Sequence, residues 1–519
     1  MKLSDYDLLQ LSEEELLELP EVVLRRLSVK LLIDLKEARE RLRQNSRNSS
    51  CPPSSDAPWS GTGGKNTPED TVQDNTETKK EIDSNGDEDD QPVKKTTEKT
   101  NRKPGKQPGA PGYGREQKIA ITSEQAHYPC ACALCEKALT PDRAQAYTAF
   151  ETVDVEWAVP THPGLRLTNT KHVYYEIACD DCGHGTRQSP YQQVADVLTP
   201  TIYLSEWRLV GSGLAALIIC LAYRMRLSRT RTQEFLHDWL GLAISVGTIN
   251  ATVHESGAAL LPVEDELVEA VQNSGLLHVD ETTWPQLNQL LWLWVFSGQD
   301  VVAYWIASRG SELLETVLDN EFKGWLMSDG WHVYRRYSKR LRCWAHLLRK
   351  ATGLQESLDP TAKQFGTETL WLLNTLIEAI YIARGQPPNQ NVNIAYQQAL
   401  TDYQRRCEVM SGAVHDKTRA LAREMLNDWD AIFQVLAYPH LPITNNEAER
   451  ALRHWVILRN SSHGTRTDDG SRIFAILISV IETCRLRQQS PWVYLAEVIR
   501  LRRSGCPAPK LPVALIHRV

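Results

Sequence analysis

The fold is decided by the stretch Leu276-Leu277-His278-Val279-Asp280-Glu281-Thr282, an apolar run that ends in two acids. A short apolar run bounded by polar residues predicts a buried β-strand. Two further strands are predicted over residues 291–296 and 301–307, joined by a turn at Ser297-Gly298-Gln299-Asp300. A helix is expected over residues 311–318. A fourth strand is predicted by Gly324-Trp325-Leu326-Met327-Ser328-Asp329-Gly330, which also ends in an acid.

Three antiparallel strands, a helix and a further strand are the opening order of a ribonuclease-H-like fold. In that fold the first and fourth strands are neighbours, so we expect Asp280 and Asp329 to share one site although 329 − 280 = 49 residues separate them. Two such carboxylates are costly unless a cation neutralises them, and a pair of magnesium ions can clamp a reacting phosphodiester. Taken singly, Asp280 could cap a loop and Asp329 could belong to an Asp-Gly turn. Their place in this strand order favours a metal site.

A third acid is expected at the helix start in Pro442-Ile443-Thr444-Asn445-Asn446-Glu447-Ala448-Glu449-Arg450-Ala451-Leu452-Arg453. Thr444 and Glu447 have the spacing of a capping box, with Thr444 as N-cap. Glu447 and Glu449 lie about 200° apart around a helix, so both cannot face one site. We therefore expect Glu449 to be the metal ligand. Its alternative is a surface ion pair with Arg453.

Between the second and third acids, 449 − 329 = 120 residues apart, lies a helical stretch. We interpret it as an all-α insertion over residues 354–440, within a catalytic domain formed by residues 263–353 and 441–485. The insertion is expected either to clamp DNA or only to pack. Just before it, the stretch Arg335 to Lys350 carries seven basic residues and no acid.

Four of the eleven cysteines form two Cys-x-x-Cys pairs, Cys132/Cys135 and Cys179/Cys182. Each pair can hold a metal from one tight turn, and four thiolates suit tetrahedral zinc. Because the intervening sequence is β-prone, we predict a zinc ribbon over residues 119–195, with Cys130 as a spare ligand that could replace Cys132. Four unrelated reduced cysteines are the alternative.

The remaining segments differ in composition. Residues 1–45 predict a helix with heptad-like leucines, which suits either a short coiled coil or packing on its own chain. Residues 46–118 are rich in charge, Ser, Pro and Gly and predict a disordered linker. Residues 196–262 predict helices that include a helix-turn-helix-like unit, for which an ordinary helical hairpin is the alternative. Residues 486–519 are expected to be a basic tail. The fold class is therefore multidomain α+β.

The net charge of −7 conceals an uneven distribution. Residues 69–90 hold two lysines and ten acids (2 − 10 = −8), whereas residues 91–118 (8 − 2 = +6) and 441–519 (12 − 6 = +6) are basic. Clustered basic charge is what DNA binding needs, although solvated helix faces would look the same. The longest apolar run, residues 213–223, is too short to span a bilayer, and no secretory signal is recognisable. We expect a cytoplasmic, nucleoid-associated protein with no membrane partner.

Several motifs, in the same order, resemble those of the large transposase of the insertion-sequence 66 family, which belongs to the DDE transposases. They are Asn48 to Asp56, Pro104 to Gly114, the two Cys-x-x-Cys pairs, Asp280-Glu281-Thr282, Asp329-Gly330, Cys343-Trp344-Ala345-His346 and Asn445-Asn446-x-x-Glu449-Arg450-x-x-Arg453. Three places depart from the family pattern, namely Cys51, Trp331 and residues 459–464. We expect these departures to affect recognition of the DNA ends more than the chemistry.

The resemblance implies a magnesium- or manganese-dependent reaction. Water frees a 3′-hydroxyl at a transposon end, and that hydroxyl then attacks target DNA. The resemblance also implies that Asp280, Asp329 and Glu449 hold the catalytic metal and that zinc is structural. Residues expected to contact DNA are His346, Arg349, Lys350, Arg450 and Arg453, with a buried structural role as the alternative for His346.

The partners implied are double-stranded DNA, both transposon ends and target, further copies of the chain in a homo-oligomer, and accessory transposition proteins. A ribonuclease-H-like nuclease that cuts without joining and an inactive DNA-binding relic are the alternative functions.

Overall fold

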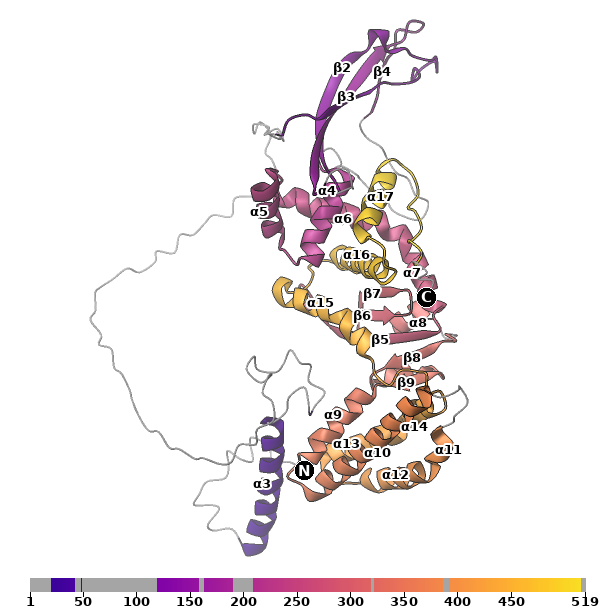
Figure 1. The fold of residues 1–519 in the computed structure, drawn as a ribbon. Helices are drawn as coiled ribbons and strands as arrows, with labels where there is room; N and C mark the ends of the chain where they lie inside the picture. The colour runs from indigo at the N-terminus through magenta and orange to yellow at the C-terminus, as the bar shows by residue number, and fades with distance from the viewer. Residues whose placement is uncertain are drawn as a thin grey trace, which may run out of the picture. The chain divides into compact units, whose positions relative to one another are not determined.

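The computed structural model describes residues 20–42, 48, 119–157, 163–189, 209–318, 322–385 and 392–514 (Figure 1). Apart from Asn48, the linker predicted over residues 46–118 lies outside the described residues. Within the described ranges, every helix falls short of the length and apolar character that a membrane crossing requires.

The N-terminal segment contains a helix, whereas the segment with the two Cys-x-x-Cys pairs consists mainly of β-strands. The helix predicted near the N-terminus is present as α3 (Glu21–Leu42). The predicted ribbon contains β1 (Ser123–His127), η2 (Pro141–Arg143), β2 (Gln145–Glu156), β3 (Arg166–Ala178) and β4 (Gly185–Arg187). Strand β3 pairs with the other three, in parallel with β1 and antiparallel with β2 and β4.

The next region is helical. It comprises α4 (Ser212–Ile219), the π-helical turn η4 (Cys220–Arg224), α5 (Arg229–Leu240), α6 (Val246–Leu260), η5 (Leu261–Val263) and α7 (Glu264–Gln272). Helix α5 ends at Gly241, whose φ of 65° is a left-handed conformation that glycine adopts without strain. Ser245 then caps α6 by accepting the backbone N–H of Thr248 at 3.0 Å. The local sequence therefore accounts for both boundaries, because Gly241 ends α5 and Ser245 caps the start of α6.

A five-stranded mixed sheet follows (Figure 1). Its strands are β5 (Leu276–Gln286), β6 (Gln289–Ser297), β7 (Val302–Ala307), β8 (Trp325–Ser328) and β9 (Arg340–Arg342), with α8 (Glu312–Leu318) and η6 (His332–Arg336) between them. The strand order is β7-β6-β5-β8-β9. Strands β5, β6 and β7 are antiparallel, whereas β5, β8 and β9 run parallel. The first and fourth predicted strands are thus neighbours, as expected.

A helical segment interrupts the chain after β9. It contains α9 (Trp344–Gln355), α10 (Pro360–Arg384), α11 (Val392–Ala395), α12 (Gln397–Met410), α13 (Asp416–Asn427), α14 (Trp429–Phe433) and η7 (Gln434–Leu436). These helices share an apolar core with Met327 and Leu341 of the sheet. At the neck of this segment, the backbone N–H of Trp344 donates to the carbonyl of Ile443 at 2.8 Å.

Three helices complete the chain, α15 (Asn446–Ser462), α16 (Asp468–Leu486) and α17 (Pro491–Arg503). Helix α16 covers the edge strand β7, where Ser479 accepts the backbone N–H of Tyr304 at 2.8 Å and Thr483 accepts that of Val302 at 3.1 Å. Backbone groups left free at a sheet edge would otherwise be open to pairing with another chain. Helix α17 lies in the segment treated above as a basic tail, and its Arg503 pairs with the buried Glu255 at 2.6 Å.

Candidate functional site

The parallel pairing of β5 with β8 brings Asp280 towards Asp329. The register pairs Leu276 with Trp325 and His278 with Met327. Continuing that register by two residues sets Asp280 opposite Asp329. The 49-residue separation in sequence thus becomes adjacency just past the β5–β8 ladder. Only Asp329 follows the end of its strand, because β5 continues past Asp280 to Gln286 rather than ending at the acids as predicted.

The electrostatic environment of Asp280 is strongly unfavourable for a charged carboxylate. Asp280 is only partly exposed, and the surrounding protein excludes most of the solvent from its carboxylate. This burial raises the pKa of Asp280 well above its usual range, and the charges of Glu281, Asp329 and Glu449 raise it further. Acids that repel one another in this way destabilise their charged forms, and a divalent cation bound between them would offset the repulsion.

Glu281 is a member of this cluster that the sequence analysis did not single out. Its side chain is 2% exposed. Burial and then the charge of Asp329 raise the pKa of Glu281 to about 7, and hydrogen bonds from Tyr334 and Arg309 oppose the shift. The Tyr334 hydroxyl donates to Glu281 at 2.7 Å and the Arg309 guanidinium at 2.9 Å. The adjacency of two acids in Asp280-Glu281 was the available signal.

Two tryptophans hold Arg309 against Glu281. Its guanidinium lies 4.3 Å from the ring centre of Trp292 and 4.5 Å from that of Trp331. Cation–π contacts at such distances restrain the side chain. Trp331, at one of the positions that depart from the family pattern, therefore packs directly beside the acids.

The start of α15 corrects the predicted capping box. The N-cap is Asn445 rather than Thr444, and no side chain caps the helix. The Asn445 amide instead donates to the carbonyl of Val279 at 2.9 Å, and its Oδ1 lies 3.2 Å from Nδ1 of His278. The buried amide satisfies the strand rather than the helix, so it fixes the start of α15 to β5.

Glu447 and Glu449 occupy different surroundings, as the helix geometry predicts. Glu447 is 59% exposed and pairs with Arg450 at 3.3 Å. Glu449 lies 3.6 Å from Arg349 and close enough to Asp280 to raise its pKa. The preference for Glu449 therefore agrees with this arrangement, although the capping argument behind it was wrong.

The three acids approach one another without closing into a tight set. Among the described residues, two groups of three or more Cys, His, Asp or Glu side chains have ligand atoms within 4.8 Å of one another. One is the set Cys132, Cys135, Cys179 and Cys182, and the other is Cys343, His346 and Glu449. Glu449 thus lies nearer to a thiol and an imidazole than the sequence analysis foresaw.

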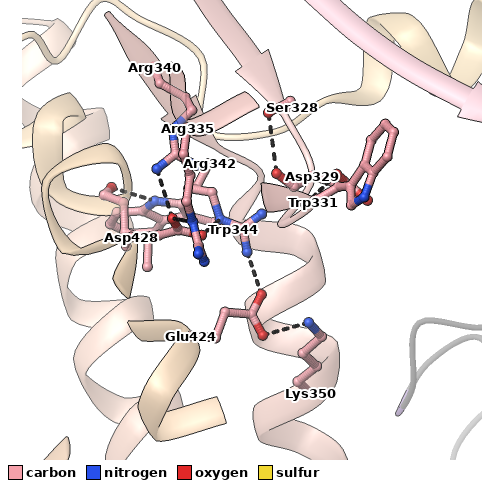
Figure 2. A network of polar contacts seen from close by, with 11 residues as sticks. Ser328, Asp329, Trp331, Arg335, Arg340, Arg342, Trp344, Lys350, Glu424 and Asp428 are labelled. Carbon is pink, nitrogen blue, oxygen red and sulfur yellow. Dashed lines mark hydrogen bonds and ion pairs between the residues drawn. The ribbon is translucent and has the colours of Figure 1, made fainter. Parts of the chain in front are cut away.

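A network of charged side chains lies beside the Asp329-Gly330 turn (Figure 2). Asp428 accepts from Arg335 at 2.9 Å and from Arg340 at 2.7 Å, and Arg342 lies 3.2 Å away. Burial alone would raise the pKa of Asp428, but the hydrogen bonds from Arg340 and Arg335 lower it below its usual range. The strand β9 is thereby tied to the helical segment.

Glu424 of α13 extends the same network towards Gly330. It accepts from Arg342 and, at 2.6 Å, from Lys350. A Cβ atom added at Gly330 would lie only 2.6 Å from Nη2 of Arg342 and 2.9 Å from Oε1 of Glu424. Glycine at position 330 therefore lets the Arg342–Glu424 pair pack directly on the Asp329-Gly330 turn, and a larger residue would require the ends of those two side chains to move.

The residues expected to contact DNA are distributed between surface and interior. Arg450 and Arg453 are exposed on α15. Arg349 and Lys350 of α9 are partly buried and face Glu449 and Glu424 respectively. His346 lies largely inside, and burial followed by the charges of Arg349 and Lys350 lowers its pKa to about 4.

The ribbon cysteines form the second candidate metal centre. Sγ atoms of Cys132 and Cys182 are 3.5 Å apart, as are those of Cys135 and Cys179. Cys130 is exposed and stands apart from this group. Four thiols at these separations fit one metal ion of the zinc class.

Comparison with known proteins identifies the region that contains the acids. A family model described as the transposase IS66 family matches residues 208–473, just over half of the chain. Residues 7–83 match a family of unknown function, DUF6444.

Curated relatives are uncharacterised proteins of Sinorhizobium fredii. The protein y4qI is 25% identical over 350 residues, which cover 61% of this chain and 64% of that protein. The protein y4jD is 23% identical over 419 residues, which cover 72% and 75%. The chain thus spans slightly less than two thirds of the length of the first of these relatives.

Proposed function

The chain belongs to the transposase IS66 family, and we propose that it is a DNA transposase in which Asp280, Asp329 and Glu449 hold catalytic magnesium or manganese. The observation that carries the proposal is the convergence of Asp280 and Asp329 at the end of the β5–β8 ladder, with the pKa of Asp280 raised well above its usual range. Such a cluster is costly as it stands and fits a divalent cation.

The sheet supports this assignment. An order of β7-β6-β5-β8-β9, with three antiparallel strands followed by two parallel ones, is the arrangement expected of a ribonuclease-H-like core. We propose that residues 263–353 and 441–485 form this core and that the helices between them are an insertion.

The protein groups divide the work of a phosphodiester reaction. A bound metal ion would activate the attacking oxygen and stabilise the leaving one. Asp280, Asp329 and Glu449 would hold that ion, and Asn445 keeps α15 in place against Val279. Exposed Arg450 and Arg453 are placed to meet the DNA backbone, with Arg349 and Lys350 deeper in the site. Phosphate contacts of this kind position DNA without reading its sequence.

The ribbon and the helical region contribute to DNA binding in this proposal. Zinc held by Cys132, Cys135, Cys179 and Cys182 would stabilise the ribbon. Helices α5 and α6 are the proposed helix-turn-helix. Homo-oligomers and accessory transposition proteins complete the proposed assembly.

The test uses the full chain and labelled DNA carrying the element's ends. Asp280→Asn should lower end cleavage on the order of 10³-fold, because the isosteric amide removes one metal-binding charge. End binding in a mobility-shift assay should persist. Normal cleavage by this variant would refute the assignment.

Strand transfer with pre-cleaved ends separates a transposase from a nuclease. The wild-type chain should join such ends to target DNA. Cleavage without any joining would favour the ribonuclease-H-like nuclease, and binding with neither reaction would favour an inactive relic.

A further inference from the structure

The neck between the sheet and the helical segment gathers three metal-ligating side chains. Cys343 follows β9, His346 lies in the first turn of α9 and Glu449 lies in the first turn of α15. Their ligand atoms lie within 4.8 Å of one another. The hydrogen bond from Trp344 N–H to the Ile443 carbonyl fixes the two chain crossings from which these side chains extend.

Two polar atoms of these side chains, Nδ1 of His346 and Oε1 of Glu449, are buried without a hydrogen-bond partner. Such atoms have lost their contact with water without gaining a partner, and a bound cation would supply one. Arg349 approaches Glu449 only at 3.6 Å, which is too long for a hydrogen bond.

The third ligand is a fully buried thiol with a polar neighbour. The backbone N–H of Asn445 points at Sγ of Cys343 from 3.2 Å. The same feature occurs in the ribbon, where the backbone N–H of Leu134 points at Sγ of Cys132 from 3.5 Å. Burial raises the pKa of the Cys343 thiol, and the N–H of Asn445 opposes that shift. A metal ion displaces the thiol proton when it binds, and the N–H donor remains directed at the resulting thiolate.

The three side chains offer three different ligand elements. One sulfur, one nitrogen and one oxygen make a borderline-soft set. Such a set suits zinc, whereas magnesium prefers oxygen ligands throughout.

We propose that Cys343, His346 and Glu449 bind a thiophilic divalent cation of the zinc class, at a site separate from the ribbon. Three protein ligands leave a fourth position open, as in exchangeable zinc sites. One consequence rests on the proposed function. Glu449 cannot serve this cation and the catalytic magnesium equally, so zinc would compete with magnesium for that carboxylate.

The binding test measures zinc in the full chain after saturation and removal of free ion. The wild type should retain two equivalents, one for each ligand group. Cys343→Ala and His346→Asn should each retain one. Cys407→Ala, which removes an equally buried cysteine within the helical segment, should retain both. Cobalt should report the same difference, because loss of Cys343 removes the charge-transfer absorption of one thiolate.

A single equivalent in the wild type would refute the proposal, provided that Cys135→Ser abolishes it. Unchanged zinc content in both Cys343→Ala and His346→Asn would refute it as well. Using two variants protects the test against misfolding of either one.

The competition test follows end cleavage in magnesium as zinc is added. Each variant is compared with its own zinc-free rate. The wild type should be inhibited at a zinc concentration at least tenfold below that needed for Cys343→Ala. Equal sensitivity would refute the competition. Absence of cleavage in every sample would count against the proposed function while leaving the zinc content decisive for the site.

Discussion

In the ribbon, four sulfur atoms from two tight turns lie within 4.8 Å of one another, whereas at the end of the sheet three acids arrive from three separate elements and form no such group. Of the four ribbon cysteines, Cys132 and Cys179 are buried, whereas Cys135 and Cys182 are exposed. The acids are backed by paired strands, by Asn445 and by the buried network around Asp428. From this contrast we expect the ribbon to need a bound ion in order to fold, whereas the sheet should hold its acids in place before any ion binds.

The largest expected effect is loss of the ribbon on removing its metal. Cys135→Ser combined with Cys182→Ser should abolish hydrogen-exchange protection in β2 and β3. A structural zinc site contributes roughly 10–16 kcal/mol of apparent binding energy to folding. Strands β5 to β8 should stay protected. A ribbon that remained protected would show that its strands, and not an ion, hold it together.

The next largest effect should be on the stability of the sheet region, which we expect to depend on Asp428 rather than on a metal ion. Asp428→Asn leaves the buried Arg340 without its counter-charge and removes one of the two carboxylates that pair with Arg342, which should cost about 3–5 kcal/mol in the free energy of unfolding. Chemical denaturation followed by tryptophan fluorescence measures this loss. Asp402→Asn is the matched control. It breaks an exposed pair with Arg405 and should cost less than about 1 kcal/mol. Similar losses of stability in both variants would mean that the buried network around Asp428 does not stabilise the sheet region more than an exposed ion pair does.

A smaller effect concerns pH. The pKa of Glu281 is about 7 in the folded chain and about 4.3 when exposed, so the folded state binds the proton more tightly. Its contribution to stability is therefore present at low pH and is lost as pH rises through 7. The expected slope is about 1.4 kcal/mol per pH unit at most.

Glu281→Gln should flatten this decline. The measurement is the thermal midpoint at pH 5.5 and pH 8 in magnesium-free buffer. An identical pH dependence in wild type and variant would mean that Glu281 is not the titrating group.

The smallest effect should come from Glu447→Gln. Glu447 is exposed and pairs with the exposed Arg450, so stability should change by less than about 0.5 kcal/mol and end cleavage should stay near wild type. Glu449→Gln, made in parallel, should lose cleavage. If the two variants exchanged these outcomes, the third acid would have to be reassigned.

The sequence predicted what depends on local spacing or on strand order. The two cysteines of each Cys-x-x-Cys pair lie close together because each pair occupies one turn, and the four thiols form one group as predicted. Alternation of apolar strands and turns was enough to expect β5 beside β8, and with it Asp280 near Asp329. Both are inferences that need no knowledge of side-chain contacts.

The parts that were missed depend on tertiary contacts. The capping box failed because the Asn445 amide is drawn to Val279, a residue 166 positions away. The role of Gly330 is visible only once Arg342 and Glu424 pack on it. Likewise, the sequence around Asp428 does not predict that this side chain contacts three arginines.

The neck at Trp344 and Ile443 has a consequence for how this family can diverge. Since one backbone hydrogen bond closes the interrupting segment at its base, the chain re-enters the sheet region beside the point where it left. The entropy of closing a loop grows only slowly with loop length. Relatives can therefore gain or lose whole helices between residues 344 and 443 while the positions of Asp329 and Glu449 in space stay fixed, so length variation among them should concentrate there.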